Sequence, residues 1–477
     1  MTDPTPLLLA ISLGAAVVAG WITPRRPLVA FGILFALASL SRATVETPVG
    51  TMRMEQPAIA VVGVVLLATG RMRVLASLPR WVWFVAGCLA VYLAVLAASS
   101  ILVAPDRAAS LRVLVWWAVS IAGGVVALVL VGQRGRAAIL PLALVAALSG
   151  AIGIITAVAF LTTATPEDHL GIQNWDSILP RVYGLAWEAN LYSSFLAACV
   201  PFGLEAARGR RDRRLGIAIA AVILVAMPLG GTRGAFIGLA VGLAVYLGTL
   251  LWRTRRPVPV AVMAGAAAAL TIGGIVLSGV LLPNPLERLG EVAGTIPSAP
   301  PVGASAVPQG STAPGDPAPV VTPIPSLPTP NDTISFRLQR VPLAFGDIPH
   351  SPLIGLGAES FGQRHADSSQ AGAPDHIAIL AVAAVYESGV IGALALAVAF
   401  AIVAVGLWRT SRRRRDAGAA AAYLGTLAAL VAAYQATNAL HFAINWMILG
   451  AAVALAAWPR DELDPGEADV AVVATPT

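Results

Sequence analysis

The chain has 477 residues, of which 57% are hydrophobic and only 12% are charged, and its mean hydropathy is +0.79. Soluble domains usually carry about 25% charged residues, so this composition excludes an ordinary soluble protein and indicates a polytopic membrane protein. The net charge of +6 comes from arginine alone. Because the arginines stand in short loops between apolar segments, they do not indicate nucleic-acid binding. Cys88 and Cys199 both fall inside apolar runs, which excludes a disulfide framework or a thiolate metal site.

Thirteen apolar segments are candidates to cross a bilayer. The sequence therefore predicts an all-α polytopic membrane protein with roughly 12–13 transmembrane helices, each needing about 20 residues. The first segment has no basic residue before it, which favours a first transmembrane helix over a signal peptide. The second, third and last segments are short for a full span, so tilting or pairing is expected there. The candidates are 7–23, 27–41, 56–70, 81–103, 110–132, 137–162, 187–205, 215–230, 234–252, 257–282, 377–408, 418–438 and 443–458.

The arginines predict the orientation of these helices. Alternate loops hold 21 of the 31 arginines, and the intervening loops hold only ten. Cytoplasmic loops carry the excess of basic residues. We therefore expect the amino terminus and the two long loops, 163–186 and 283–376, to be extracytoplasmic and the carboxyl terminus to be cytoplasmic. All five histidines then lie on the extracytoplasmic face: His169, His350, His365, His376 and His441.

The chain divides at its longest loop. Within that loop, residues 297–330 contain 11 prolines in 34 residues and a single charged residue. Such a composition cannot build a core, so we interpret it as a disordered or polyproline-like insert, with a partner-binding role as the alternative. The four parts are residues 1–282 with the first ten spans, 283–376 as the large extracytoplasmic loop, 377–459 with the C-terminal transmembrane helices, and 460–477 as a cytoplasmic tail.

A helix is expected to start after the insert, near Thr333, where cap-type residues precede it. Arg337 and Arg340 are three residues apart and would share one face of that helix. Pro342 predicts that the helix is short or kinked.

Two further arginines stand in loops of the extracytoplasmic face, where basic residues are disfavoured. Arg181 precedes the helix that carries Glu188 and Asn190, and Arg233 lies in Gly230-Gly-Thr-Arg-Gly-Ala, a tight junction between two spans. A guanidinium at the membrane–water boundary can hold a lipid-linked phosphate through two hydrogen bonds, and adjacent glycines let such a ligand approach the backbone. Snorkelling of both side chains to phospholipid headgroups remains open as the alternative.

His376 is the best candidate for acid–base chemistry. It stands where the long loop re-enters the membrane, with Asp375 beside it and Glu387 eleven residues further on. An imidazole titrates near neutral pH and can remove a proton from a hydroxyl group. The alternative is a capping histidine at a helix start, and His350 and His365 are weaker candidates. No spacing of His, Cys and Asp resembles a metal site, and no phosphate-binding P-loop or GxGxxG motif is present.

Several short blocks follow one another between residues 175 and 395, with many spans before them and few after. They are Arg181-x-x-Gly184 followed by Asn190, Thr232-Arg233-Gly234, Ser335-x-Arg337 followed by Pro352-Leu-Ile-Gly-Leu-Gly-Ala-Glu-Ser-Phe, and His376 followed by Glu387-x-Gly389. In this order they resemble the O-antigen ligase and O-antigen polymerase superfamily of bacterial membrane glycosyltransferases. Ile377 follows the histidine, where the family normally has asparagine.

The resemblance implies a GT-C-like enzyme of the bacterial plasma membrane. Such an enzyme takes a glycan from a polyprenyl-diphosphate carrier and attaches it to an acceptor hydroxyl on a glycan, lipid or protein, at the extracytoplasmic face. The resemblance gives Arg181 and Arg233 the diphosphate, Arg337 a further phosphate or sugar contact, and His376 the acceptor hydroxyl as a base. Diphosphate is already a good leaving group, so the implied chemistry needs positioning and charge neutralisation but no metal or cofactor. The supporting positions are Gly184, Asn190, Gly355, Gly357 and Glu387.

Other functions remain open. A ligase and a polymerase differ only in the acceptor, which the sequence does not identify. A transporter of lipids or glycans would favour ionisable residues and broken helices at mid-membrane, whereas the polar residues here gather outside the spans. A scaffold for envelope assembly is a third alternative, although it does not need extracytoplasmic arginines and a histidine at these positions.

Overall fold

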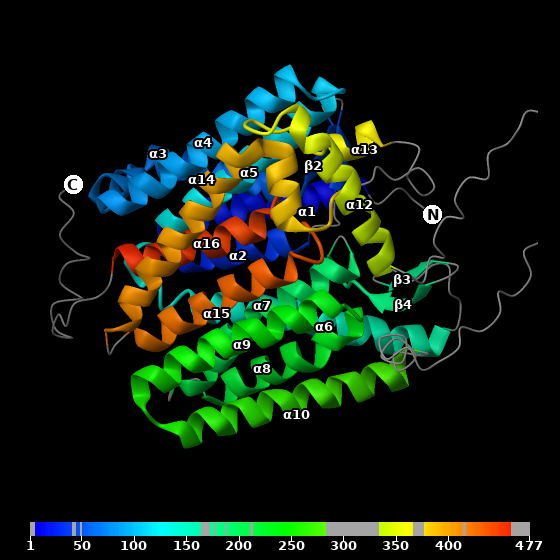
Figure 1. Cartoon of the computed structure of the whole chain (residues 1–477). Coiled ribbons are helices and arrows are strands. Elements are labelled where there is room, and N and C mark those ends of the chain that lie inside the picture. Colours follow the sequence, from blue (N-terminus) through cyan, green and yellow to red (C-terminus); the bar gives the residue numbers. More distant parts are fainter. Residues whose placement is uncertain are drawn as a thin grey trace, which may run out of the picture.

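The computed structural model describes residues 5–40, 44–47, 50–163, 172–175, 178–186, 188–209, 213–282, 333–365, 376–413 and 416–458. In these residues the chain forms a bundle of long helices, with two short β-hairpins and short helices at one end (Figure 1). The insert 297–330 and the tail 460–477 lie outside the described residues.

Each of the thirteen predicted segments is a helix in the structure. They are α1 (Thr5–Ile22), α2 (Pro27–Ser39), α3 (Glu55–Ala68), α4 (Arg80–Leu102), α5 (Arg107–Val131), α6 (Ile139–Thr163), α7 (Ala189–Arg208), α8 (Arg213–Ala226), α9 (Arg233–Thr254), α10 (Pro257–Leu281), α14 (Leu380–Ser411), α15 (Ala417–Ala433) and α16 (Ala443–Ala457).

Not every helix is long and apolar enough to cross a bilayer alone. Seven of the described helices are: α4, α5, α6, α8 continued to Gly230, α9, α10 and α14. An eighth is added if α3 and the 3-10 helix η1 (Arg71–Ser77), bent by 78°, form one span. The apolar helices α1, α2, α15 and α16 are shorter. The protein is therefore an all-α polytopic membrane protein, and its described residues contain fewer full-length spans than the predicted 12 or 13.

The helices sort into a protected centre and an apolar outside. Helices α7, α15 and α16 are buried along most of their length. Helices α4 and α10 turn large apolar side chains outward, among them Trp83 and Val258, which are 54% and 70% exposed. An exposed apolar face of this kind is suited to lipid. Because α7 is enclosed by other helices, it needs no continuous apolar surface, and its first turns carry Asn190, Ser193 and Ser194.

Small residues allow close helix packing between α9 and α15. Gly238 and Gly242 on α9 face Ala429 on α15, where an added Cβ would lie 2.8 Å from the Ala429 carbonyl oxygen or 2.7 Å from its Cβ. Gly425 meets α9 in the same way, since its Cβ would lie 2.7 Å from the Gly242 carbonyl oxygen. Without a hydrophobic force between helices in lipid, such close approach supplies the packing energy.

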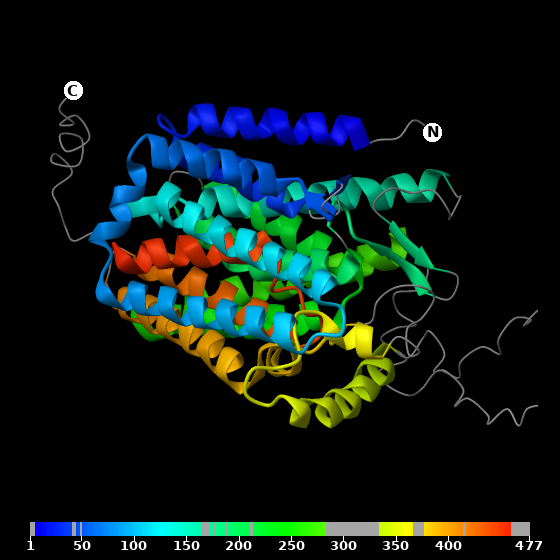
Figure 2. The same ribbon diagram turned by 90° about the horizontal axis from the view of Figure 1, so that it is seen from above.

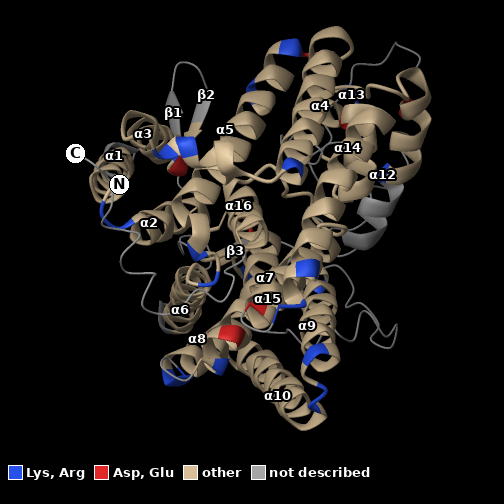
Figure 3. Ribbon diagram, turned by 90° about the vertical axis from the view of Figure 1, so that its left-hand side faces the viewer, with Lys and Arg blue, Asp and Glu red and all other residues tan. Residues whose placement is uncertain are grey.

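The bundle has two unlike ends. The turns α1–α2, α7–α8, α9–α10 and α14–α15, with η1 and η2 (Gly132–Arg134), carry most of the arginines and form what we name the arginine-rich end. Hydrogen bonds join these turns, from Arg71 to the Pro24 carbonyl at 2.6 Å and from Arg253 to the Arg412 carbonyl. Figure 3 views this end, with arginines at the ends of α8, α9 and α10.

The opposite end, which we name the loop end, holds the short strands and helices that connect the long helices (Figure 2). These connecting elements carry the other polar residues. Strand β1 (Thr44–Thr47) pairs antiparallel with β2 (Gly50–Arg53), and β3 (Ile172–Trp175) pairs antiparallel with β4 (Ile178–Val182). The remaining elements are the 3-10 helices η3 (Met227–Gly230) and η4 (Ile348–His350) and the helices α12 (Thr333–Asp347) and α13 (Ser360–Arg364). The hairpins were not predicted from the sequence.

Helix α12 starts at Thr333, as predicted. It then continues through Pro342 to Asp347, so the proline does not end the helix. Within a helix, proline lacks a backbone N–H donor, and its ring clashes with the carbonyl group one turn earlier. Helix α12 lies at the outside of the bundle (Figure 1), and its later residues Leu343 and Phe345 are 41% and 58% exposed.

Candidate functional site

The structure brings Arg181 and Arg233 to neighbouring pieces of backbone at the loop end. Arg181 lies on β4, opposite Gln173 of β3. The residue after it, Val182, lies against the turn that precedes α9, where a Cβ on Gly230 would lie 3.2 Å from the Val182 carbonyl oxygen. Arg233 follows that turn as the first residue of α9. Arg181 is half-buried and Arg233 is exposed.

Asn190 and Gly184 hold this junction together. The Thr232 hydroxyl lies 3.3 Å from the Asn190 amide oxygen and 3.0 Å from the Gly230 carbonyl oxygen. Gly184 has φ of +55°, a conformation that costs other residues energy, and it packs against the ring of Tyr192. The predicted positions Arg181, Gly184, Asn190 and Arg233 therefore form one group, which we name the arginine junction.

The loop 352–357, which contains Gly355 and Gly357, fills a break in α14. The sequence did not reveal this contact. Gly389 has φ of +62° and ψ of −174°, so α14 is interrupted there. The break frees backbone groups, and the loop supplies their partners: the Leu356 and Gly357 amides donate to the Tyr386 and Glu387 carbonyls at 2.8 and 3.1 Å. In return the Val390 amide donates to the Pro352 carbonyl at 2.9 Å. Irregular backbone in a membrane protein is stable only with such replacements.

Glycine is required on both sides of this contact. Gly355 and Gly357 have φ of +79° and +103°. A Cβ on Gly355 would lie 2.5 Å from the Glu387 carbonyl oxygen, and one on Gly389 would overlap with Leu353. The Ser99 hydroxyl of α4 donates to the Glu387 carbonyl at 2.9 Å, so α4 also supports the break. Gly355, Gly357 and Glu387 thus shape the site through their backbone.

The end of this loop carries a half-buried carboxyl group, Glu359, which interacts electrostatically with His376. Glu359 is one of two non-glycine residues among the described ones with positive φ, at +48°. Burial raises the pKa of Glu359, and the nearby positive charges of His376 and Arg53 oppose that rise. The Glu387 carboxyl accepts a hydrogen bond from the Glu359 backbone. His376 itself is exposed, four residues before α14 begins.

Arg53 was counted among the ten arginines of the extracytoplasmic loops but was not singled out. It ends β2, is only 6% exposed, and its guanidinium carbon lies 4.2 Å from the ring centre of Phe442 and 4.9 Å from that of Trp116. Burial lowers the pKa of Arg53, while the charges of Glu55 and Glu359 act in the opposite direction. Its Nη1 has no hydrogen-bond partner within the described part of the chain. A buried guanidinium with a spare donor is a typical anion-binding group.

His441 completes this second group, which we name the histidine cluster: Arg53, Glu359, His376 and His441. Burial lowers the pKa of His441 well below its ordinary value, and the charges of Arg53 and His376 act in the same direction. A neutral imidazole beside a buried arginine can accept a hydrogen bond. The sequence signal for Arg53 was the same as for Arg181, namely an arginine in a loop that disfavours it.

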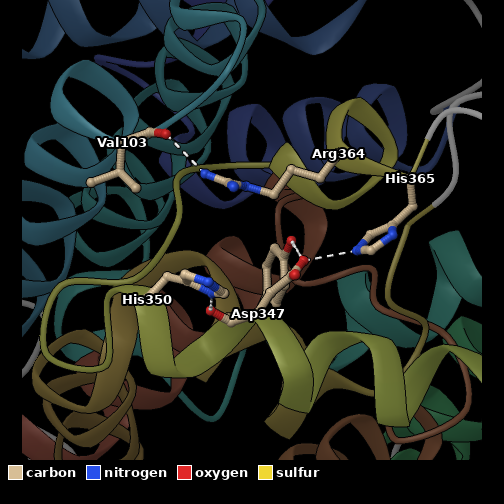
Figure 4. A network of polar contacts seen from close by, with 6 residues as sticks. Val103, Asp347, His350, Arg364 and His365 are labelled. Atoms are coloured by element: carbon tan, nitrogen blue, oxygen red, sulfur yellow. Dashed lines mark hydrogen bonds and ion pairs between the residues drawn. The ribbon is translucent and has the colours of Figure 1, made fainter.

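A separate polar network anchors α12 to the bundle (Figure 4). The Asp347 carboxylate accepts a hydrogen bond from the Tyr386 hydroxyl at 2.8 Å and lies 2.8 Å from Nε2 of His365. Burial acts to raise the pKa of Asp347, but the hydrogen bonds with Tyr386 and His365 outweigh it and lower the pKa. His350 contacts the Asp347 backbone carbonyl at 2.9 Å, and Arg364 donates to the Val103 carbonyl at 3.0 Å. His350 and His365 therefore have structural partners.

Some predicted positions stay untested. Arg337 lies on α12, but its side chain is outside what the structure describes, while Arg340 one turn later is only 5% exposed. His169 and Asp375 also lie outside the described residues. Among the described residues, no group of three or more His, Cys, Asp and Glu side chains is placed to hold a metal ion. No family model matches the sequence, and no curated protein matches it.

Proposed function

We propose that this protein is a membrane glycosyltransferase that moves a glycan from a polyprenyl-diphosphate carrier to an acceptor hydroxyl. The observation that carries the proposal is the arginine junction, where Arg181 and Arg233 start from adjoining backbone at one end of an apolar helical bundle. A diphosphate attached to a lipid must lie at such a boundary. Two guanidinium groups can neutralise the negative charge that grows on it as it leaves.

The proposed transfer forms one bond and breaks another, and each of these groups has a role in it. The unprotonated imidazole of His376 removes the proton of the acceptor hydroxyl, and the oxygen attacks the anomeric carbon of the donor sugar. The bond from that carbon to the diphosphate oxygen breaks, and the bonding electrons leave with the diphosphate. Arg181 and Arg233 hold the leaving group. Glu359 acts as a positioning residue, because its negative charge interacts with His376 and favours the imidazolium that results.

The loop end is the side on which transfer takes place, and we assign it to the extracytoplasmic face of a bacterial plasma membrane. The excess of arginines at the opposite end supports this orientation. The donor would be a carrier-linked glycan and the acceptor a glycan, lipid or protein, in a GT-C-like arrangement. A ligase and a polymerase of carrier-linked repeat units share this chemistry. Fusing a reporter at residue 310 and another at Arg413 tests the assignment, since only the first is expected outside the cell.

The break in α14 favours a second candidate, a lipid or glycan transporter. Discontinuous helices with a buried ionisable residue, here Glu387 at 8% exposure, are common at transporter binding sites. In this chain, however, the break is closed by the loop 352–357, which pairs its backbone groups. The two functions differ in their products: a transferase makes a new glycosidic bond, whereas a transporter only moves the donor across a bilayer.

The deciding experiment uses the purified full chain with a polyprenyl-diphosphate glycan and an acceptor glycan. Formation of the joined product, with release of polyprenyl diphosphate and with chelator present, is the expected result. Movement of the donor across a proteoliposome membrane without a new bond would replace transfer by transport. A strict requirement for an added metal ion would reject the mechanism proposed for His376 and the arginines.

A further inference from the structure

A cavity of about 570 Å³ lies at the arginine-rich end, far from the groups assigned to transfer. It is lined by η2, the start of α6, the end of α7, the residue before α15 and the end of α16. None of the residues of the arginine junction or the histidine cluster lines it. The lining residues that the argument uses are Arg134, Arg136, Glu205, Arg208, Asp416 and Trp458.

Two exposed arginines, Arg134 and Arg136, line the cavity beside an ion pair. Arg208 and Glu205 form an ion pair at 2.5 Å, and the Tyr246 hydroxyl donates to Glu205 at 3.1 Å, so these groups balance one another. Arg134 and Arg136 are exposed and belong to the short turn between α5 and α6. Cationic groups at the mouth of a cavity between helices attract anionic headgroups.

Inside the cavity, Asp416 requires a hydrogen-bond donor, whereas the arginines attract an anion. It is only 3% exposed, and its Oδ2 has no hydrogen-bond partner among the residues that the structure describes. Although it stands at the N-cap of α15, its side chain makes no capping hydrogen bond. A buried carboxylate oxygen without a donor is costly, so a bound molecule with a hydroxyl or ammonium group would stabilise it.

We propose that this cavity binds the headgroup of a bilayer phospholipid, with its phosphodiester at Arg134 and Arg136 and its hydroxyl or ammonium group donating to Asp416. The position suits a lipid, because the arginine-rich end is where the helices meet the headgroup layer. Leu455 and Trp458 also line the cavity and offer apolar and amphipathic surface for the glycerol and upper acyl chain. The site is independent of glycan transfer.

The arginine part of the proposal is tested by native mass spectrometry of the full chain with dioleoylphosphatidylglycerol. In the double variant Arg134→Gln/Arg136→Gln, the dissociation constant should rise about tenfold, the effect of losing a charged hydrogen bond. The control is Arg256→Gln, an exposed arginine of the same end outside the cavity, which should bind as the wild type does. Equal binding by the double variant and the control would overturn the proposal. The single variant Arg134→Gln, expected to show a smaller loss, replaces the double variant if that protein aggregates.

The Asp416 part is tested with two lipids of the same net charge. Phosphatidylethanolamine can donate from its ammonium group and phosphatidylcholine cannot, so the wild type should prefer the first and Asp416→Asn should lose most of that preference. A wild type without the preference would overturn the role of Asp416. A third arm uses water-soluble glycerophosphoglycerol and inorganic phosphate. Binding of either as tight as that of the lipid would identify a free phosphate compound as the ligand and reject the lipid.

Discussion

The two ends of the bundle use the same residue, arginine, in different surroundings. At the arginine-rich end, every described arginine is exposed except the half-buried Arg253. At the loop end the arginines are fewer, yet Arg53 and Arg340 are buried and Arg181 is half-buried. An exposed guanidinium keeps its water, and at the arginine-rich end most of these groups set the orientation in the membrane. A buried one has lost that water, so it must gain from other contacts.

This contrast teaches that position within the fold, rather than residue type, separates orienting arginines from binding arginines. At the loop end, the strand β4 and the turn before α9 hold their arginines on constrained backbone. At the other end, most of the arginines stand on turns between helices. The following predictions test this difference, starting with the largest expected effect.

Removing an arginine of the junction should abolish transfer. Arg181→Ala or Arg233→Ala each takes away a charge from the diphosphate site, and losses of about 100-fold or more are typical when an electrostatic contact to a leaving group is removed. Arg→Lys at the same positions should also be impaired, because an ammonium group cannot make the two parallel hydrogen bonds. The measurement is product formation by purified protein that still inserts and elutes as one species.

Arg26→Ala is the matched change at the arginine-rich end. Arg26 is exposed in the α1–α2 turn, so its loss should leave the turnover rate unchanged. If Arg26→Ala and Arg181→Ala reduced transfer equally, the proposed difference between the two ends would be wrong.

His376→Ala should lower the rate by about 10²–10⁴-fold, the usual contribution of a general base. Because the imidazole acts on the acceptor and the arginines act on the donor, binding of the polyprenyl-diphosphate glycan should be unchanged. Donor binding and turnover are therefore measured on the same preparation. Normal turnover would exclude His376 as the base, and lost donor binding would place it with the arginines instead.

Sequence alone predicted the helices well because long apolar runs leave a membrane chain few choices. It also singled out Arg181 and Arg233, since an arginine in a disfavoured loop is visible without a structure, and the structure brings their backbones to one junction. It did not find the α9–α15 packing, although Gly234, Gly238 and Gly242 stand at four-residue spacing.

Tertiary structure was needed to find the break in α14 and the residues of the histidine cluster other than His376. The break at Gly389 depends on backbone partners from a loop more than 30 residues away, and Glu359 meets Glu387 only because that loop is docked. Arg53 and His441 are separated by nearly the whole chain, so no local pattern places them together.

A glycine at positive φ, Gly389, and a glycine at a close helix contact, Gly242, allow a structural test. Gly389→Ala forces a residue with a side chain into φ of +62° and ψ of −174° and also overlaps with Leu353. Strain of this kind costs about 1–3 kcal/mol before the overlap is counted. Gly242→Ala only forces α9 and α15 apart, since its φ is helical. We expect a lower unfolding temperature for both variants, with transfer lost mainly in Gly389→Ala.

Gly248→Ala provides the control for this pair. It lies on α9 with no atom within 4 Å of an added Cβ, so the change should be neutral or slightly stabilising, as alanine favours helix more than glycine does. A similar loss of stability at Gly248 and Gly242 would contradict the close-packing interpretation.

Acid should weaken the anchoring of α12 through Asp347, whose pKa is lowered below the ordinary 3.8 by hydrogen bonds with Tyr386 and His365. A carboxyl group with a lowered pKa in the folded state contributes stability above its unfolded pKa and loses it as the pH falls through the folded pKa. The unfolding temperature of Asp347→Asn should therefore be about 1 °C below that of the wild type at pH 6, a small effect because the pair is partly exposed. The difference should disappear below pH 3.8, and a difference that grows in acid would show the opposite sign of the shift.

Deleting residues 297–330 should have the smallest effect. The deletion shortens the connection between Leu282 and Thr333 from 50 residues to 16. Sixteen residues can still span about 50 Å. Since the closure entropy of a loop depends on the logarithm of its length, stability should rise by only about 1 kcal/mol. The insert contributes no arginine or histidine to either group of the loop end, so transfer by the purified deletion protein should match that of the wild type. A lower turnover with normal folding would instead give the insert a part in holding the acceptor, and it would extend the binding surface of the loop end beyond the two groups that contain Arg181 and His376.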